Sequence, residues 1–246
     1  MYRNSMTMDI YGGVYTFFSE IFFPNGHKFT YCKDIRISFT KPNKGYRTLI
    51  IDKVAAEYIN GELPQDFDFV MSWLGNVLYP LNIEISPTGT PKSIVNFNEV
   101  RKRYSDEGQR IMAHYEQAPL IVQYVETCLE RVRDEKLFLQ HIGQSNIYQL
   151  MVLCMDISGH SYQLSDFPFT RNSLTFQFVI EDENETELLL TVPEIKTERK
   201  LLSHESRAYV HKTGMGTFDH IQFILIVELE GDGYYTRRLE LKRIKE

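Results

Sequence analysis

The chain has 246 residues, of which 43% are apolar and 24% are charged, and its formal net charge is −6. This composition is typical of globular proteins, and the length is sufficient to bury a core in one large domain or two small ones. The acidic balance argues against non-specific nucleic-acid binding and against adsorption on anionic lipid, because both depend on positively charged surface. We therefore expect no nucleic-acid partner and no membrane partner.

Residues 10 to about 60 are predicted to form a meander of about four strands. The segments at 13–18, 27–39 and 46–51 are rich in aromatic and β-branched residues, which suit strands. The turn Pro24-Asn25-Gly26 separates the first two segments, since Asn and Gly tolerate positive φ. A second turn is predicted at 41–45. Lys33-Asp34 is a possible interruption of the strand predicted at 27–39.

Residues 64 to 155 are predicted to be mainly helical, because their apolar residues recur at i, i+3, i+4 and i+7. The first helix begins near Pro64 and ends before Pro80, and a short hairpin over 81–95 with a turn at 87–89 follows it. The expected apolar faces are Val70, Trp73, Leu74, Val77 and Leu78; Phe97, Val100, Tyr104, Ile111 and Tyr115; Ile121, Val125, Cys128 and Val132; and Ile147, Leu150, Met151 and Cys154.

Residues 171 to 246 are predicted to return to strands. Leu174, Phe176, Phe178 and Ile180 alternate with other residues, which is typical of one half-buried strand. A turn at 182–185 leads into a second strand at 186–192, and a further strand is expected at 208–211. The segments 220–230 and 234–244 form the clearest hairpin of the chain, joined by Gly231-Asp232-Gly233.

The fold class that follows is α+β. An antiparallel meander (about 10–60), central helices (about 64–155) and a second antiparallel meander (about 171–246) make a sheet, or two sheets, curved around the helices. Strands joined by short turns must be antiparallel, because parallel pairing needs a long crossover. Without a linker of low complexity, we expect one domain over 1–246, with two sub-lobes, 1–155 and 156–246, as the alternative.

The cysteines and the first residues indicate a reducing compartment. Cys32, Cys128 and Cys154 are odd in number and far apart, which is not the pattern of a disulfide framework. The first thirteen residues contain no apolar stretch of signal-peptide length, and no segment reaches the ~18 apolar residues that span a bilayer. We expect a soluble, cytoplasmic protein.

The stretch GHSYQ at 159–163 is similar to part of the G-x-S-x-G motif of α/β-hydrolases. In that motif the serine lies on a tight turn between a strand and a helix, and small residues on both sides allow the close approach. Here Gln163 replaces the second glycine, and residues 164–168 are predicted to be a loop. Asp166 with His204, His211 or His220 would complete a triad. We favour a polar loop over a catalytic Ser161, and we predict no catalytic residue.

No metal or nucleotide site is predicted. Zinc ligands occur in pairs at short spacing, which the four histidines of the last third lack (His160, His204, His211 and His220). No phosphate-binding glycine motif occurs, so no cofactor is expected. The acidic run at 181–187 lacks the glycine of a calcium loop and is predicted to be a hairpin tip, or an acidic patch for a basic partner.

Two basic clusters have structural interpretations. Arg101-Lys102-Arg103 is predicted to lie on a solvated helix face. Arg237-Arg238 and the basic residues at 242–245 belong to the last strand, where charged side chains would protect a sheet edge from aggregation.

The segment 11–23 is apolar on both faces. As a strand, it would place Tyr15, Phe17, Ile21 and Phe23 on one side and Val14, Phe18 and Phe22 on the other. Such a strand needs cover on both sides. Ordinary core packing within the chain would provide it, and so would a bound partner or ligand. Our candidate residues for an apolar interface or pocket are Tyr15, Phe17, Phe18, Phe22 and Phe23.

Three functions are consistent with these patterns. The leading hypothesis is a non-enzymatic interaction protein, such as an adaptor, assembly component or inhibitor, with a protein partner or self-association. The second is a carrier of a small apolar ligand in a cavity between the curved sheet and the helices. The third is a serine hydrolase that uses Ser161.

Overall fold

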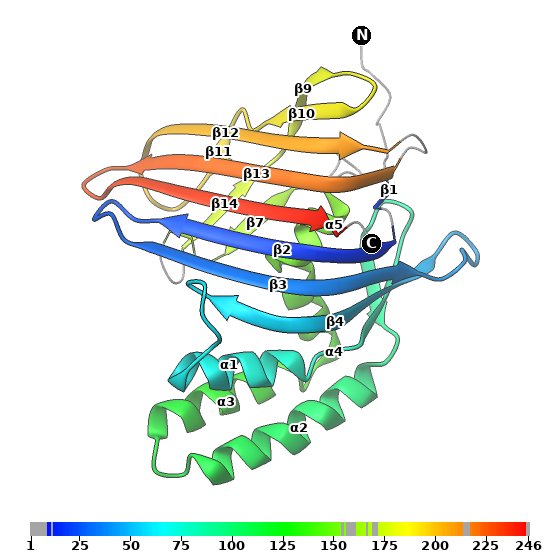
Figure 1. Ribbon diagram of the computed structural model, residues 1–246, viewed down its shortest axis with the longest axis vertical. Coiled ribbons are helices and arrows are strands. Elements are labelled where there is room, and N and C mark those ends of the chain that lie inside the picture. Colours follow the sequence, from blue (N-terminus) through cyan, green and yellow to red (C-terminus); the bar gives the residue numbers. More distant parts are fainter. Residues whose placement is uncertain are drawn as a thin grey trace.

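The chain follows the predicted order of strands, helices and strands in a computed structural model that describes residues 9–10, 12–153, 155, 161–165, 167–168, 172–213 and 217–244 (Figure 1). The first strands are β1 (Asp9–Ile10), β2 (Gly13–Phe22), β3 (Lys28–Phe39) and β4 (Arg47–Ile59). The central part contains α1 (Asp66–Asn76), β5 (Leu81–Ile85), β6 (Pro91–Ile94), α2 (Phe97–His114), α3 (Pro119–Arg131), α4 (Glu135–Gly143) and α5 (Asn146–Val152). The last part contains β7 (Tyr162–Ser165), β8 (Ser173–Phe176), β9 (Val179–Glu183), β10 (Glu187–Thr191), β11 (Ile195–Lys196), β12 (Leu201–Lys212), β13 (Thr217–Leu229) and β14 (Gly233–Arg243).

The two meanders join into one large sheet. Its strand order is β6-β5-β4-β3-β2-β14-β13-β12-β10-β9, with every neighbouring pair antiparallel, and β1 adds a short parallel pairing to β13. The connection between the meanders is the pairing of β2 with β14, in which Ser19 lies opposite Leu239. The predicted antiparallel α+β architecture is therefore confirmed, and of the two alternatives, one sheet or two, the chain forms two: this large sheet and a small sheet of order β11-β8-β7.

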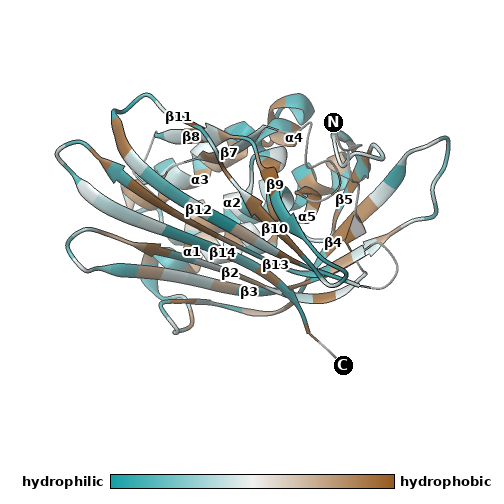
Figure 2. Cartoon of the chain, turned by 90° about the horizontal axis from the view of Figure 1, so that it is seen from above, coloured by the Kyte–Doolittle hydropathy of each residue, from teal (hydrophilic) through white to brown (hydrophobic). Residues whose placement is uncertain are grey.

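The sheet curves around the helices, as expected. Figure 2 shows α2 to α5 and a small sheet, with order β11-β8-β7, in the hollow of the large sheet. The strands alternate buried and partly exposed residues, because successive side chains point to opposite faces. On β13 the buried set is Ile221, Phe223, Leu225, Val227 and Leu229, and these side chains face the hollow.

The helices bury the predicted faces. Phe97, Val100, Tyr104 and Ile111 of α2 are buried, and Gly108 allows α2 to approach α3 closely, since a Cβ at Gly108 would lie 3.0 Å from Leu129. Helix α4 was not predicted. It begins after Asp134, whose carboxylate accepts the Leu137 N–H at 2.8 Å.

The turn at 87–89 connects the β5–β6 hairpin to α5. Gly89 has a φ of +78°, a value that favours glycine, and a Cβ there would lie 2.9 Å from Val152. The Tyr148 hydroxyl donates a hydrogen bond to the Gly89 carbonyl at 2.6 Å. This contact fixes α5 against the end of the large sheet.

Three expectations are wrong. Residues 164 and 165, predicted to belong to a loop, are the end of strand β7, which pairs with β8. The alternating segment 174–180 is not one strand: β8 pairs with β7 in the small sheet, whereas β9 pairs with β10 in the large sheet. The chain passes between the two layers at Gln177 and Phe178, and the alternation persists because Phe178 is buried between them. The last strand is not an edge, since β14 lies between β2 and β13 at the centre of the sheet.

Candidate ligand-binding cavities

The five aromatic residues singled out in the sequence lie on both faces of the large sheet. Tyr15 and Phe17 are buried on the concave side, and Phe23 packs edge-on against Tyr235 with the ring centroids 6.3 Å apart. Phe18 and Phe22 point to the convex side. The structure therefore does not bring the five side chains to one surface.

Basic side chains cover part of the outward rings. The Arg238 guanidinium lies 5.6 Å from the Phe18 ring centroid, and the Lys28 ammonium lies 5.7 Å from that of Phe22, which is 41% exposed. Charged groups continue across this convex face. Burial opposes the ionisation of Glu240, but hydrogen bonds from Gln222, His220 and Arg238 lower its pKa below the usual value.

Ser161 is exposed and lies beside Thr175, Gln177 and Lys196 at a cavity of about 210 Å³. The three histidines considered as its partners have other contacts: His204 with the Val192 carbonyl, His211 with Asp219 and His220 with Glu240. Gly159, His160, Asp166 and Cys154 lie outside the described residues. Within the described residues, no three His, Cys, Asp or Glu side chains gather in a way that could hold a metal ion.

A cavity of about 220 Å³ lies between the sheet and the helices, and we call it the tyrosine cavity. Strands β4 and β5 form one wall, while the loop before β5 and helices α2 to α5 form the others. Its lining residues are Ile51, Leu78, Tyr79, Leu81, Tyr104, Tyr124, Cys128, Arg131, Val132, Phe138, His141, Ile142, Ser145, Ile147 and Tyr148. Most of these side chains are apolar or aromatic, which is typical of small-molecule sites.

Two tyrosine hydroxyls of this cavity have no protein partner. Tyr148 donates to Gly89, but the hydroxyls of Tyr79 and Tyr104 make no hydrogen bond to another described residue. Burial raises the pKa of Tyr79 to about 12, and burial also raises the pKa of Tyr104. Both phenols are therefore protonated at neutral pH and can donate to an acceptor atom of a ligand.

The tyrosine cavity continues into a cleft of about 770 Å³. Arg131, His141 and Ser145 line both spaces and mark the passage between them. The Arg131 charge lies close enough to Tyr104 and Tyr124 to lower their pKa values, although burial outweighs this effect. A polar or acidic group of a ligand would therefore be favoured at this passage.

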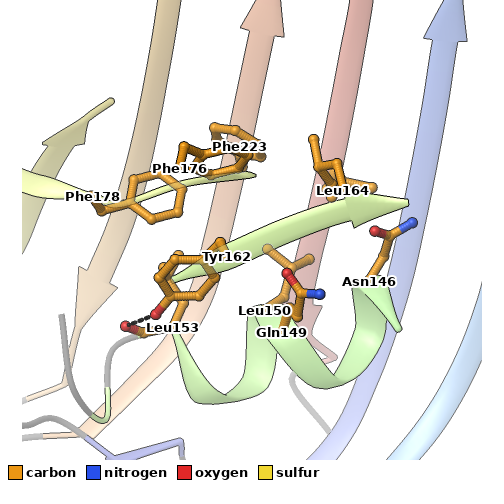
Figure 3. Close-up of a pocket in the computed structure, with 10 residues that line it drawn as sticks. Asn146, Gln149, Leu150, Leu153, Tyr162, Leu164, Phe176, Phe178 and Phe223 are labelled. Atoms are coloured by element: carbon orange, nitrogen blue, oxygen red, sulfur yellow. Dashed lines mark hydrogen bonds between the residues drawn. The ribbon is translucent and has the colours of Figure 1, made fainter. Parts of the chain in front are cut away.

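A second, aromatic cavity lies under the central strands, where α5 and the small sheet meet the large sheet (Figure 3). Its lining residues include Tyr162, Phe176, Phe178, Phe223 and Leu239. The Phe223 ring centroid is 5.1 Å from that of Phe178 and 5.5 Å from that of Phe176. The free volume is about 20 Å³, which is room for roughly one water. This region is therefore a packed aromatic cluster.

A buried ion pair supports the wall of the tyrosine cavity. The Lys33 ammonium lies 3.7 Å from the Glu57 carboxylate, donates to the Asn76 side chain at 3.1 Å and lies 4.4 Å from the Tyr79 ring centroid. The Tyr31 hydroxyl donates to Glu57 at 2.5 Å. These contacts join β3, β4 and α1 to the Tyr79 ring, so they hold the ring in place.

Burial of this pair affects its protonation. Desolvation lowers the pKa of Lys33 to about 8, although Glu57 opposes the shift. Between pH 8 and about 10.5, the unfolded chain holds more protons at this site than the folded chain. The contribution of Lys33 to the free energy of unfolding therefore rises with pH through this window.

Comparison with known proteins gives no family. No family model and no curated protein match the chain. Among solved structures, a lipovitellin structure titled for lipid–protein interactions aligns over 95% of this chain and 25% of its own, with 13% identity and a TM-score of 0.38. The structure of Rv2717c from M. tuberculosis aligns over 95% of this chain and 92% of its own, with 9% identity and a TM-score of 0.26.

The chain therefore spans a quarter of the lipovitellin chain that it matches. Both TM-scores are too low to carry a conclusion about ligand or activity. None of the helices in the described residues has the length and apolar character needed to cross a membrane.

Proposed function

We propose that the protein binds and carries a small, mostly apolar molecule in the tyrosine cavity. The observation that carries this proposal is the pair of phenols, Tyr79 and Tyr104, which line a mostly apolar cavity and make no hydrogen bond to another described residue. Ligand sites combine apolar walls with a few polar groups that fix the orientation of the ligand. A ligand oxygen would provide the missing acceptor.

The volume of the tyrosine cavity limits the size of the ligand. The volume of about 220 Å³ equals that of roughly seven waters at ~30 Å³ each, so the part held between Tyr79 and Tyr104 is small. A longer molecule would extend past Arg131 and His141 into the cleft. Its polar atoms would be acceptors, since the groups available are phenol hydroxyls and a guanidinium.

The two described cysteines provide the test. Cys128 lines the tyrosine cavity, whereas Cys32 pairs with Phe18 on the opposite face of the sheet. Burial raises the pKa of both thiols, so alkylation is measured at mildly alkaline pH, in a Cys154→Ser background. A panel of short aliphatic and aromatic acids and alcohols is added, and peptide mass spectrometry follows each cysteine.

A ligand in the tyrosine cavity should slow the alkylation of Cys128 and leave that of Cys32 unchanged. Native mass spectrometry should show the same compound as a one-to-one adduct. Filling the cavity with Ile147→Trp should abolish both effects. If no compound protects Cys128 and the purified protein carries no adduct, the proposal is wrong.

A second candidate function is protein binding, which a groove beside α1 favours. The groove has a volume of about 430 Å³ and is lined by Ala56, Leu63, Pro64, Phe69 and Trp73 together with four polar residues. Leu63 is 57% exposed and Phe69 is 47% exposed. Contiguous exposed apolar surface of this kind is typical of interfaces.

Affinity purification from the native host tests this candidate. The wild-type chain should recover a stoichiometric companion, and Phe69→Asp should lose it without a change in melting temperature. Recovery of the protein alone would count against an interaction role.

A further inference from the structure

Arg237 occupies an unusual place for a charged residue. It lies on β14 at the centre of the large sheet, on the concave face with Tyr235 and Leu239, and only 8% of it is exposed. The neighbouring strands place Leu225 and Ile21 directly opposite it. A guanidinium in these surroundings has lost its hydration and gained only apolar neighbours on the adjoining strands.

No described residue compensates this charge. Arg237 makes no hydrogen bond or ion pair within the described residues, and its buried Nε has no acceptor. Burial lowers the pKa of Arg237 to about 10, and no nearby charge contributes to the shift. The side chain is nevertheless protonated at neutral pH. A buried charge without a partner costs several kcal/mol, and an unsatisfied buried group of this kind points to a missing ion or ligand.

Arg238, the next residue on β14, differs from Arg237 because it has an anionic partner. Arg238 points to the convex face, where its guanidinium contacts the Glu240 carboxylate at 2.9 Å and covers the Phe18 ring. The partly exposed Arg238 thus has an anionic partner in the protein, whereas the buried Arg237 has none within the described residues. Lys33, another buried cation of the concave side, already has Glu57.

We infer that Arg237 binds the carboxylate of an apolar acid on the concave face of the large sheet. A carboxylate matches the planar guanidinium with two parallel hydrogen bonds, and its single charge equals the single uncompensated cation. A phosphate would bring a second charge that this position does not balance. Ile21 and Leu225 lie opposite Arg237 on the neighbouring strands, and the buried Leu239 follows on the same face, so the guanidinium stands among apolar residues.

This site is distinct from the tyrosine cavity, whose lining does not include Arg237. Leu239, two residues further along the same face, lines the aromatic cavity instead. The inference therefore goes beyond the proposed function, and either can fail without the other.

The test compares decanoate with decanol on four proteins: the wild type, Arg237→Met, Arg237→Lys and the outward control Arg238→Met. Decanoate labelled with ¹³C at the carboxyl carbon should give a shifted bound signal with wild type and with Arg238→Met. Arg237→Met should bind decanoate at least tenfold more weakly. Arg237→Lys, which keeps the charge but loses the planar fork, should bind with intermediate affinity.

The ligand-free proteins give a second readout. Arg237→Met should melt at a higher temperature than wild type, because it removes an uncompensated buried charge, and decanoate should raise the melting temperature of wild type and of Arg238→Met but not that of Arg237→Met. Unchanged decanoate binding in Arg237→Met, equal losses in Arg238→Met, or tighter binding of decyl phosphate than of decanoate would overturn the inference. Cys128 protection, measured in the same variants, reports the tyrosine cavity separately.

Discussion

The tyrosine cavity and the aromatic cavity lie under the same concave face and are both rich in aromatic side chains, yet one is open and the other is filled. Their free volumes are about 220 Å³ and about 20 Å³. Strands β7 and β8 cover the aromatic cavity, and their rings interlock with Phe223 from the large sheet. Helices cover the tyrosine cavity, and wide cylinders resting on a curved sheet leave space between them. The covering element, rather than the aromatic content, thus determines where a ligand could fit.

The largest expected difference concerns truncation of a phenylalanine in each region. Phe223 and Phe138 are 2% and 3% exposed, and they line the aromatic and the tyrosine cavity respectively. Phe223→Ala should lower the free energy of unfolding by about 4–5 kcal/mol, because all sides of its ring are packed. Phe138→Ala should cost about 3 kcal/mol, since one side already faces empty space. Urea unfolding measures both, and equal losses would contradict the comparison.

Alkaline pH should lower the stability of the folded chain through Tyr79, which lines the tyrosine cavity. The pKa of Tyr79 is about 12 in the folded chain and about 10 in the unfolded chain, so ionisation between these values favours unfolding. The free energy of unfolding should fall by about 1–3 kcal/mol from this residue as pH rises from 10 to 12. Tyr79→Phe should remove that part of the pH dependence. Parallel stability curves for the wild type and Tyr79→Phe over this range would refute the expectation.

The smallest effect concerns a single hydroxyl. Tyr104→Phe should change the free energy of unfolding by less than about 0.5 kcal/mol, because the hydroxyl has no protein partner to lose. The affinity for a compound that protects Cys128 should fall about fivefold, which corresponds to one hydrogen bond of about 1 kcal/mol. Tyr148→Phe is the matched control: it loses the bond to Gly89, so it should reduce stability by about 1 kcal/mol.

Local patterns predicted most of the fold. Alternation on β13 and β14 and the turn at 231–233 identified the last hairpin, and helical spacing identified the buried face of α2. The pairing of β2 with β14 could not be predicted, because registers between segments more than 200 residues apart leave no local signal. The end of strand β8 before Phe178 could not be predicted either. Phe178 is buried between the two layers, so it continues the alternation that is typical of a strand.

The candidate site was predicted only in outline. A cavity between the curved sheet and the helices was the second hypothesis, but its residues were interpreted as core. Tyr104 and Cys128 were placed on apolar helix faces, and the hydroxyl on the first of these was the available signal. Tyr79 and Tyr124 lay outside every predicted stripe. Which of these phenols lack a partner depends on distances between helices, and spacing along the chain does not contain that information.

The central position of β14 has a consequence for synthesis of the chain. Residues 233–243 leave the ribosome after the other described strands of the large sheet, yet they insert between β2 and β13. Until then both neighbours present long unpaired edges, and such edges are templates for aggregation. Nascent or truncated chains that lack this segment should therefore depend on chaperones, whereas full-length chains bury both edges in a single step.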